Sequence, residues 1–192
     1  MFPITPILDD FNRADENPIV GYVPIGRGGN VKIVSNQATA ATSDGQVYRN
    51  SPLSSNDHQA YITVANVGNL GSHFEIVLRD YDGVQNFFYE IAFNNGDPWF
   101  VYFRKYTGAF TQIGTNVTIP SIVANDIVGA SVGGSKITAF LNGVELTSVY
   151  DTTITLGRYI GFGCGDTTLR LDNFGGGTNQ LEVPDSCASG LS

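Results

Sequence analysis

Apolar and polar side chains alternate along residues 73–104 of the chain. Within 73–79, Phe74, Ile76 and Leu78 occupy every second position, and successive side chains of a β-strand point to opposite faces. The alternating segments are 73–79, 87–93 and 99–104, separated by turn-type sequences at 80–83 and 94–98. This pattern predicts a three-stranded antiparallel meander with one face in the core and the other in solvent.

Short segments rich in Val, Ile, Phe and Tyr recur through the rest of the chain, with Gly, Asn and Asp between them. Such spacing is typical of an antiparallel sandwich or barrel. We expect strands at 31–34, 46–48, 59–67, 126–132, 136–141, 144–148, 159–163 and 168–174. Residues 120–126 could form one helical turn at most, so the sequence predicts an all-β protein.

The length of 192 residues suits a single domain with a substantial core. We expect the domain to span residues 8–177. Residues 1–7, which Pro3 and Pro6 interrupt, form a predicted N-terminal arm. Residues 178–192 form a predicted C-terminal tail, because the composition turns to Gly, Thr, Asn, Pro and Ser from Gly175 onward.

Charge and composition exclude several classes of partner. A formal net charge of −8 disfavours nucleic acid, which is bound by clustered Lys and Arg. No apolar stretch approaches the roughly 20 residues of a membrane span, and the N-terminus lacks the basic start of a secretory signal. We therefore expect synthesis in a cytoplasm. Of the two cysteines, Cys164 lies in an apolar strand and Cys187 in the tail, and we expect them not to pair.

Two similar acidic-aromatic segments, 8–15 and 169–177, lie near the two ends of the chain. Since chain ends often lie close together, we expect terminal strands that meet and close the domain. Asp10 and Asp172 would then come together and could hold calcium with the help of backbone carbonyls. The favoured interpretation is structural, with both carboxylates accepting local backbone hydrogen bonds. We expect no cofactor, with calcium as the alternative.

Several short motifs follow one another in a familiar order. They are Asp-Asp-Phe-Asn-Arg-Ala-Asp (9–15), Val-Lys-Ile-Val-Ser-Asn (31–36), His-Phe-Glu-Ile-Val-Leu-Arg (73–79), Phe-Tyr-Glu-Ile (88–91), Phe-Leu-Asn-Gly (140–143) and Leu-Asp-Asn-Phe (171–174). The order resembles the concanavalin A-like lectin/glucanase superfamily, and within it the laminin-G-like jelly-roll domains of bacteriophage virion proteins. The resemblance covers roughly residues 8–177 and implies a two-sheet antiparallel jelly-roll β-sandwich.

The resemblance implies several roles, and fold alone does not choose among them. The concave sheet or rim loops of the family often bind carbohydrate, some members are glycosidases, and many phage members are structural. Our leading hypothesis is a non-enzymatic virion protein of the tail or capsid surface, located in the virion. It would be an oligomer that contacts other virion proteins through its arm or tail and that also binds host glycans. The alternatives are a free carbohydrate-binding lectin and, less favoured, a glucanase-type hydrolase.

Glycosidases place two carboxyl groups on either side of one sugar. Glu75 and Glu90 should share a face of the meander, but the alternating Glu/Asp spacing of the glucanase branch is absent, because Val77 and Arg79 follow Glu75 on its face. A cross-strand charge lattice of these two glutamates with Arg79 and Arg104, on a solvated face, is the favoured interpretation.

The same face carries both polar groups and aromatic rings, a mixture that suits the hydroxyl edges and CH faces of sugars. In the alternative interpretation, Phe88 and Phe100 are covered by a loop or a neighbouring subunit and bind nothing soluble. Tyrosines in the adjacent turns would add recognition contacts or simply pack across a loop. The predicted carbohydrate-binding residues are His73, Glu75, Arg79, Glu90, Phe100, Tyr102, Arg104, Tyr81 and Tyr106.

Overall fold

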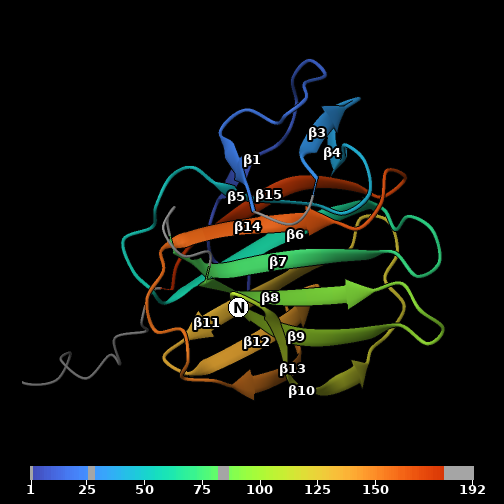
Figure 1. The fold of residues 1–192 in the computed structure, drawn as a ribbon. Helices are drawn as coiled ribbons and strands as arrows, with labels where there is room; N and C mark the ends of the chain where they lie inside the picture. Colours follow the sequence, from blue (N-terminus) through green and yellow to red (C-terminus); the bar gives the residue numbers. More distant parts are fainter. Residues whose placement is uncertain (1, 26–28, 82–86, 180–192) are drawn as a thin grey trace, which may run out of the picture.

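The computed structural model describes residues 2–25, 29–81 and 87–179, which form fifteen β-strands and no helix. The strands make two antiparallel sheets that pack face to face (Figure 1). In spatial order, sheet A contains β13 (Val144–Tyr150), β12 (Lys136–Leu141), β11 (Ile127–Gly133), β6 (His58–Asn66), β15 (Arg170–Thr178), β4 (Gln37–Ala40) and β3 (Val31–Val34), and β1 (Ile7–Asp9) also pairs with β15. Sheet B contains β10 (Phe110–Thr118), β9 (Phe100–Thr107), β8 (Phe87–Asn94), β7 (His73–Asp80), β14 (Tyr159–Cys164), β5 (Gly45–Arg49) and β2 (Tyr22–Pro24). The predicted two-sheet jelly-roll sandwich is confirmed.

The meander predicted from the alternating pattern is β7, β8 and β9 at the centre of sheet B. Its register places Ile76 opposite Ile91, and Ile91 opposite Phe103. These three side chains are at most 1% exposed and point into the core between the sheets. The polar positions in between therefore point away from the core, as alternation requires.

The two terminal segments meet as expected. β1 pairs with β15, with Asp9 opposite Phe174. Just after β1, Phe11 enters the core, and the rings of Phe11 and Phe174 lie 5.7 and 5.1 Å from the ring of Phe162. All three rings are fully buried. The ends of the domain are thus joined by backbone pairing and by a shared aromatic cluster.

The glycine-rich run near residue 175 belongs to a strand. β15 continues to Thr178, past the predicted end of the last strand at Phe174. A Cβ atom at Gly175 would lie 2.1 Å from Cζ of Tyr61. Glycine is needed here for close packing between strands. Residues 180–192, including Cys187, lie outside the described residues, and Cys164 is a buried free thiol.

Residues 2–6 of the N-terminal arm, which the sequence predicts to dock on neighbouring subunits, cover part of the outer face of sheet A. The ring of Phe2 stacks on Phe140 of β12, with 4.1 Å between the ring centroids. The arm therefore packs against its own sheet in this structure. No helix among the described residues is long and apolar enough to cross a membrane.

Candidate functional site

The outer face of sheet B gathers most of the predicted carbohydrate-binding residues. β7, β8 and β9 lie side by side, and every second side chain points away from the core. The residues on this face are His73, Glu75, Val77, Phe88, Glu90, Phe100, Tyr102, Arg104 and Tyr106. The structure thus brings seven of the nine predicted residues to one surface and leaves Arg79 and Tyr81 elsewhere.

The two glutamates of this face are buried, at 2% and 1% exposure for Glu75 and Glu90. Arg104 lies directly opposite Glu90, and its Nε donates to Glu90 Oε1 at 2.7 Å. Nε2 of Gln46, on β5, donates to Glu75 Oε2 at 2.7 Å and to Glu90 Oε2 at 3.0 Å. Three of the four residues of the expected charge lattice, Glu75, Glu90 and Arg104, do come together, but the expectation that they lie on a solvated face was wrong for the two glutamates.

A glycine in β14 makes room for this arrangement. Gly163 lies between Gln46 on one side and Glu75 on the other in the register of the sheet. A Cβ atom at Gly163 would lie 2.2 Å from Glu75 Oε2. The missing side chain lets the glutamine and the glutamate meet above the strand between them.

Electrostatic shifts follow from the burial of these charges. Desolvation raises the pKa of Glu90, and the nearby charge of Glu75 raises it further. His73 Nε2 lies 3.7 Å from Asp44 Oδ1 and 3.2 Å from Glu75 Oε1. Hydrogen bonds to Asp44 and Glu75 raise the pKa of His73 to about 10, so this imidazole is cationic at neutral pH.

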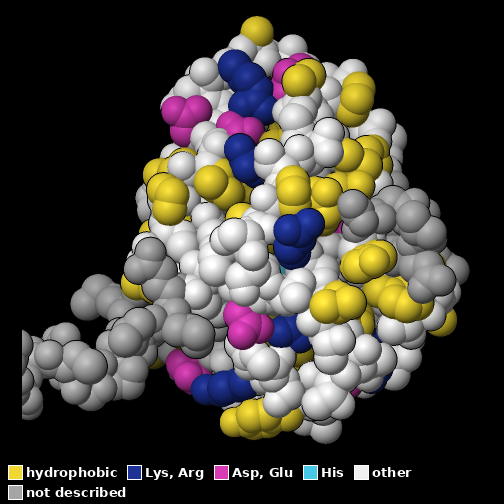
Figure 2. Space-filling view, turned by 90° about the vertical axis from the view of Figure 1, so that its left-hand side faces the viewer, with side chains coloured by type: hydrophobic (Ala, Val, Ile, Leu, Met, Phe, Trp, Pro, Cys, Tyr) yellow, Lys and Arg dark blue, Asp and Glu magenta, His cyan; other side chains and the backbone are white. Residues whose placement is uncertain are grey.

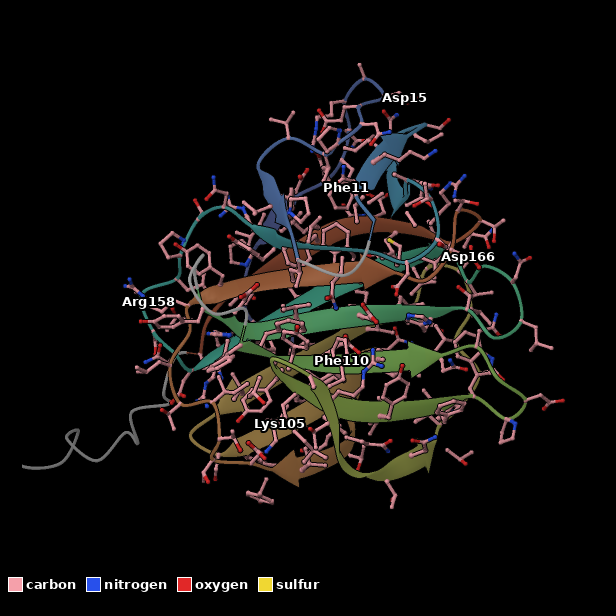
Figure 3. All side chains as sticks on the ribbon, viewed as in Figure 1. Phe11, Asp15, Lys105, Phe110, Arg158 and Asp166 are labelled. Atoms are coloured by element: carbon pink, nitrogen blue, oxygen red, sulfur yellow. The ribbon has the colours of Figure 1, made fainter. Side chains whose placement is uncertain are left out.

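One end of the face is aromatic. Phe88 is 2% exposed because the β9–β10 hairpin covers it, with the Tyr106 ring 5.3 Å and the Phe110 ring 6.0 Å away. Phe110 lies in front of the sheet in Figure 3, and the Arg104 guanidinium is 4.1 Å from its ring centroid. The cover over Phe88 is therefore part of the chain itself, whereas Phe100 stays partly exposed.

The aromatic end continues toward Tyr81, which lies beyond the end of β7. Tyr159 of β14 packs against Tyr48 of β5 at 5.2 Å and also borders a hollow of about 260 Å³ lined by Tyr81, Leu156 and Arg158. Figure 3 labels Arg158 at this end, and Figure 2 faces it and shows hydrophobic side chains beside basic ones. Tyr81 is 43% exposed and adjoins the face without lying on it.

Arg79 does not join the lattice or the predicted binding face. A register shift between β7 and β14 and a positive φ of 51° at Arg79 break the alternation. The guanidinium instead donates to the carbonyls of Asn56, Ile154 and Gly134, at 2.9, 2.7 and 2.8 Å, and to Asp57 Oδ1 at 2.8 Å. The Arg79 side chain thereby links the β5–β6, β11–β12 and β13–β14 loops at one end of the sandwich.

The predicted calcium ligands lie in the paired terminal segments but accept local hydrogen bonds. Asp10 Oδ1 accepts from the backbone N–H of Asn12 at 3.0 Å, and Asp172 Oδ1 from that of Asn173 at 2.7 Å. These bonds support the structural interpretation. Burial, together with the charges of Asp10 and Asp9, raises the pKa of Asp172.

A different set of possible metal ligands lies at the polar end of the face. Among residues 2–25, 29–81 and 87–179, only Asp44, His73 and Glu75 bring three potential ligand atoms within 4.8 Å of one another. Imidazole with two carboxylates suits zinc or another transition metal better than calcium, which prefers oxygen ligands alone.

The sequence missed the residues that complete the face from other strands. Gln46 and Tyr48 do alternate on β5, which was a usable signal for their common orientation. Their position beside β7 depends on β14 pairing with both strands. That pairing joins residues at least 79 positions apart in the sequence, which no local pattern indicates.

Comparison with known proteins shows similarity in fold and none in sequence family. No family model and no curated protein matches the chain. Among solved structures, the carbohydrate binding module CBM66 from Bacillus subtilis has a TM-score of 0.65 at 15% identity, covering 82% of this chain and 96% of its own. The β-glucanase of Bacillus licheniformis gives 0.60 at 12%, covering 90% and 97%. The exoplasmic/lumenal domain of VIP36, in a Ca²⁺/Man-bound form, gives 0.59 at 10%, covering 84% of each chain. These neighbours share the concanavalin A-like lectin/glucanase fold, and the chain has that fold.

Proposed function

We propose that this protein binds carbohydrate on the outer face of sheet B. The observation that carries the proposal is a row of partly exposed aromatic rings beside two cationic donors held in place from below. Phe100, Tyr102 and Tyr106 are partly exposed along β9. The side chains of His73 and Arg104 are 23% and 28% exposed. Rings offer flat apolar surfaces to sugar CH groups, and the cations donate to hydroxyls.

The donors are preorganised, which reduces the entropy lost on binding. Arg104 is fixed by Glu90 and lies between the rings of Tyr102 and Phe110, at 5.2 and 4.1 Å from the guanidinium carbon. His73 is fixed by its two acidic neighbours. The buried carboxylates orient these donors and also balance their charge. Together with the net charge of −8, this balance favours an uncharged glycan over a polyanionic one.

The structural neighbours support carbohydrate as the ligand class. CBM66 is a carbohydrate binding module, and the VIP36 domain was solved with mannose. At these identities the likeness transfers only the fold, so the surface residues of this chain carry the argument. The virion role, the virion partners and the virion location are hypotheses that rest on the motif resemblance alone. Calcium remains a hypothesis that rests on the placement of Asp10 and Asp172 in the paired terminal segments.

We also propose that the protein is not an enzyme. The carboxyl groups of a glycosidase must reach the glycosidic bond. Glu75 and Glu90 are almost fully buried, and Glu90 is bonded to both Arg104 and Gln46. The glucanase alternative has one observation in its favour, the raised pKa of Glu90, which a general acid would need.

Affinity electrophoresis through gels with neutral polysaccharides, together with a glycan array, tests the binding proposal. We expect at least one glycan to retard the protein, and Tyr102→Ala to weaken that binding about tenfold, or about 1.4 kcal/mol. Tyr150→Ala, on β13 of sheet A and 70% exposed in the native chain, is the matched control and should bind normally. The proposal fails if no glycan binds or if the two variants behave alike. Release of reducing sugar by the native chain, abolished in Glu90→Gln, would instead support the glucanase.

A further inference from the structure

The outer face of sheet A contains a groove shaped to the N-terminal arm. The Phe2 ring stacks on Phe140 at an interplanar angle of 7° and meets Tyr61 edge-on at 6.3 Å. Gly129 lies beneath it, where a Cβ atom would be 2.4 Å from Cζ of Phe2. A side chain at Gly143 would meet the Phe2 carbonyl oxygen at 2.5 Å. Glycines thus form the floor and wall where the ring enters.

The groove continues along the rest of the arm through hydrogen bonds to its backbone. The Tyr61 hydroxyl donates to the carbonyl of Thr5 at 2.9 Å, and the backbone N–H of Gly176 to that of Pro6 at 3.2 Å. The Ile4 N–H donates to Gln59 Oε1 at 3.4 Å. Gln59 and Tyr61 are only 2% and 6% exposed although they point away from the core. The arm is what covers this part of the sheet.

The arm joins the body of the domain at a single point. Residues 2–9 lie on sheet A, Asp10 is exposed, and Phe11 is fully buried in the core. Eight residues reach about 28 Å when extended. An arm that leaves its groove while Phe11 stays in place therefore has this length available to span the distance to the groove of an adjacent copy.

We propose that this groove receives the N-terminal arm of a second copy of the chain, which takes the first copy's arm in return. The groove fits this sequence in particular, through the stacked ring of Phe2 and the accepting carbonyls of Thr5 and Pro6. Every contact of the arm is the same after exchange, and reciprocal exchange gives a closed two-fold dimer.

The arm of a second copy must compete with the groove's own arm. Because that arm is covalently linked to the groove, its effective concentration there is in the millimolar range. Dilute protein is therefore monomeric, and the dimer forms where copies are crowded. This dependence on concentration separates arm exchange from a fixed interface.

Cysteine pairing between two different full-length variants provides the test. Thr5 and Gly177 face each other, since a Cβ atom at Gly177 would lie 3.3 Å from Cβ of Thr5, near the spacing of a disulfide. One variant carries Thr5→Cys and the other Gly177→Cys, both with Cys187→Ser. A size tag after Ser192 distinguishes the chains. Only an arm seated in the other chain's groove brings the two new cysteines together.

We expect the mixed variants to give a disulfide-linked heterodimer on oxidation, with a yield that rises severalfold when the protein concentration is raised tenfold. Tyr150→Cys in place of Gly177→Cys gives the yield of random collisions and should remain low. Adding Phe2→Ala to the Thr5→Cys chain should reduce the yield, whereas Ile4→Ala should not, because the Ile4 side chain is 56% exposed.

The double variant Thr5→Cys/Gly177→Cys checks the seating of the arm within one chain. It should form an intramolecular disulfide at low concentration. The proposal is overturned if this internal bond forms while the mixture never exceeds the collision yield. It is equally overturned if the internal bond does not form, because the arm would then not occupy the groove.

Discussion

Replacing Arg104 with methionine tests whether the buried carboxylates of sheet B depend on this guanidinium. The substitution keeps an unbranched side chain between the rings of Tyr102 and Phe110. It removes the hydrogen bond to Glu90 and the ion pair at 3.5 Å to Glu75. Two carboxylates would remain beneath the surface without the cation that lies between them.

The size of the effect follows from burial and from pH. Removing one partner of a buried ion pair costs about 3–5 kcal/mol. Here the Arg104 side chain is 28% exposed and Glu90 takes up a proton more readily than usual, so we expect a loss of about 2 kcal/mol at pH 8. The folded protein holds a proton on Glu90 above the pH at which the unfolded chain releases it. The destabilisation should therefore grow as the pH rises, and at pH 5 we expect less than about 1 kcal/mol.

Urea unfolding followed by the fluorescence of Trp99 measures the loss, since this is the one tryptophan of the chain and it is buried. The double variant R104M/E90Q supplies the control, because it removes the cation together with one of the carboxylates. We expect it to regain at least half of the stability lost by R104M at pH 8. The reasoning is refuted if R104M costs the same at both pH values, or if the double variant is no more stable than the single one.

Three further predictions concern stability. The two histidines should contribute opposite pH dependences: burial lowers the pKa of His58 to about 4, so its contribution to stability falls as the pH drops below 6.5, whereas the raised pKa of His73, about 10, makes its contribution fall as the pH rises above 6.5. Each contribution should change by about 1–3 kcal/mol, and H58Q and H73Q should each remove one of the two slopes from the urea-unfolding profile. Gly163→Ala should lower the free energy of unfolding by about 2 kcal/mol, because the new Cβ would lie 2.2 Å from Glu75 Oε2. Gly133→Ala is the control, since its Cβ would have its nearest contact at 4.0 Å and should cost under about 1 kcal/mol. Equal losses of the two variants in urea unfolding would contradict this reasoning. Asp166→Ala should lower the free energy of unfolding by about 2 kcal/mol, and with it the midpoint of thermal unfolding. The reason is that Asp166 Oδ1 accepts hydrogen bonds from the backbone N–H groups of Thr168 and Leu169 and from the Thr168 hydroxyl, at 2.6–2.8 Å. An unchanged midpoint would show that the turn at 166–169 does not depend on these hydrogen bonds.

The part of the fold that the sequence predicted best is the part with local periodicity. Alternation correctly predicted which side chains of β7, β8 and β9 point to each face of the sheet. It therefore also predicted that Glu75, Glu90 and Arg104 share one face. It failed at Arg79, because an irregular backbone conformation at the end of the strand turns this side chain away from the outer face of the sheet. A bulge of this kind arises from pairing with β14 and leaves no local signal in the sequence.

Other features required knowledge of neighbours far away in the chain. β10 was not predicted, since an edge strand with a register shift carries little alternation. Gly175 was assigned to the region after the last strand, yet it lies in β15, where the Tyr61 side chain occupies the space of its Cβ. Gly163 was expected in a strand, but no local pattern indicated that Glu75 occupies the space of its Cβ. The burial of Glu75 was missed for the same reason, because Gln46 comes from a strand that only the complete sheet places beside it.

The two proposals use opposite faces of one sandwich. The carbohydrate face is the outer side of sheet B, and the arm groove is the outer side of sheet A. Exchange of arms therefore leaves both carbohydrate faces of a dimer uncovered. A polysaccharide repeats its binding unit along the chain, so two linked faces would hold it more tightly than one face without any new contact. Crowding would thus strengthen glycan binding by changing only which copy's groove each arm occupies.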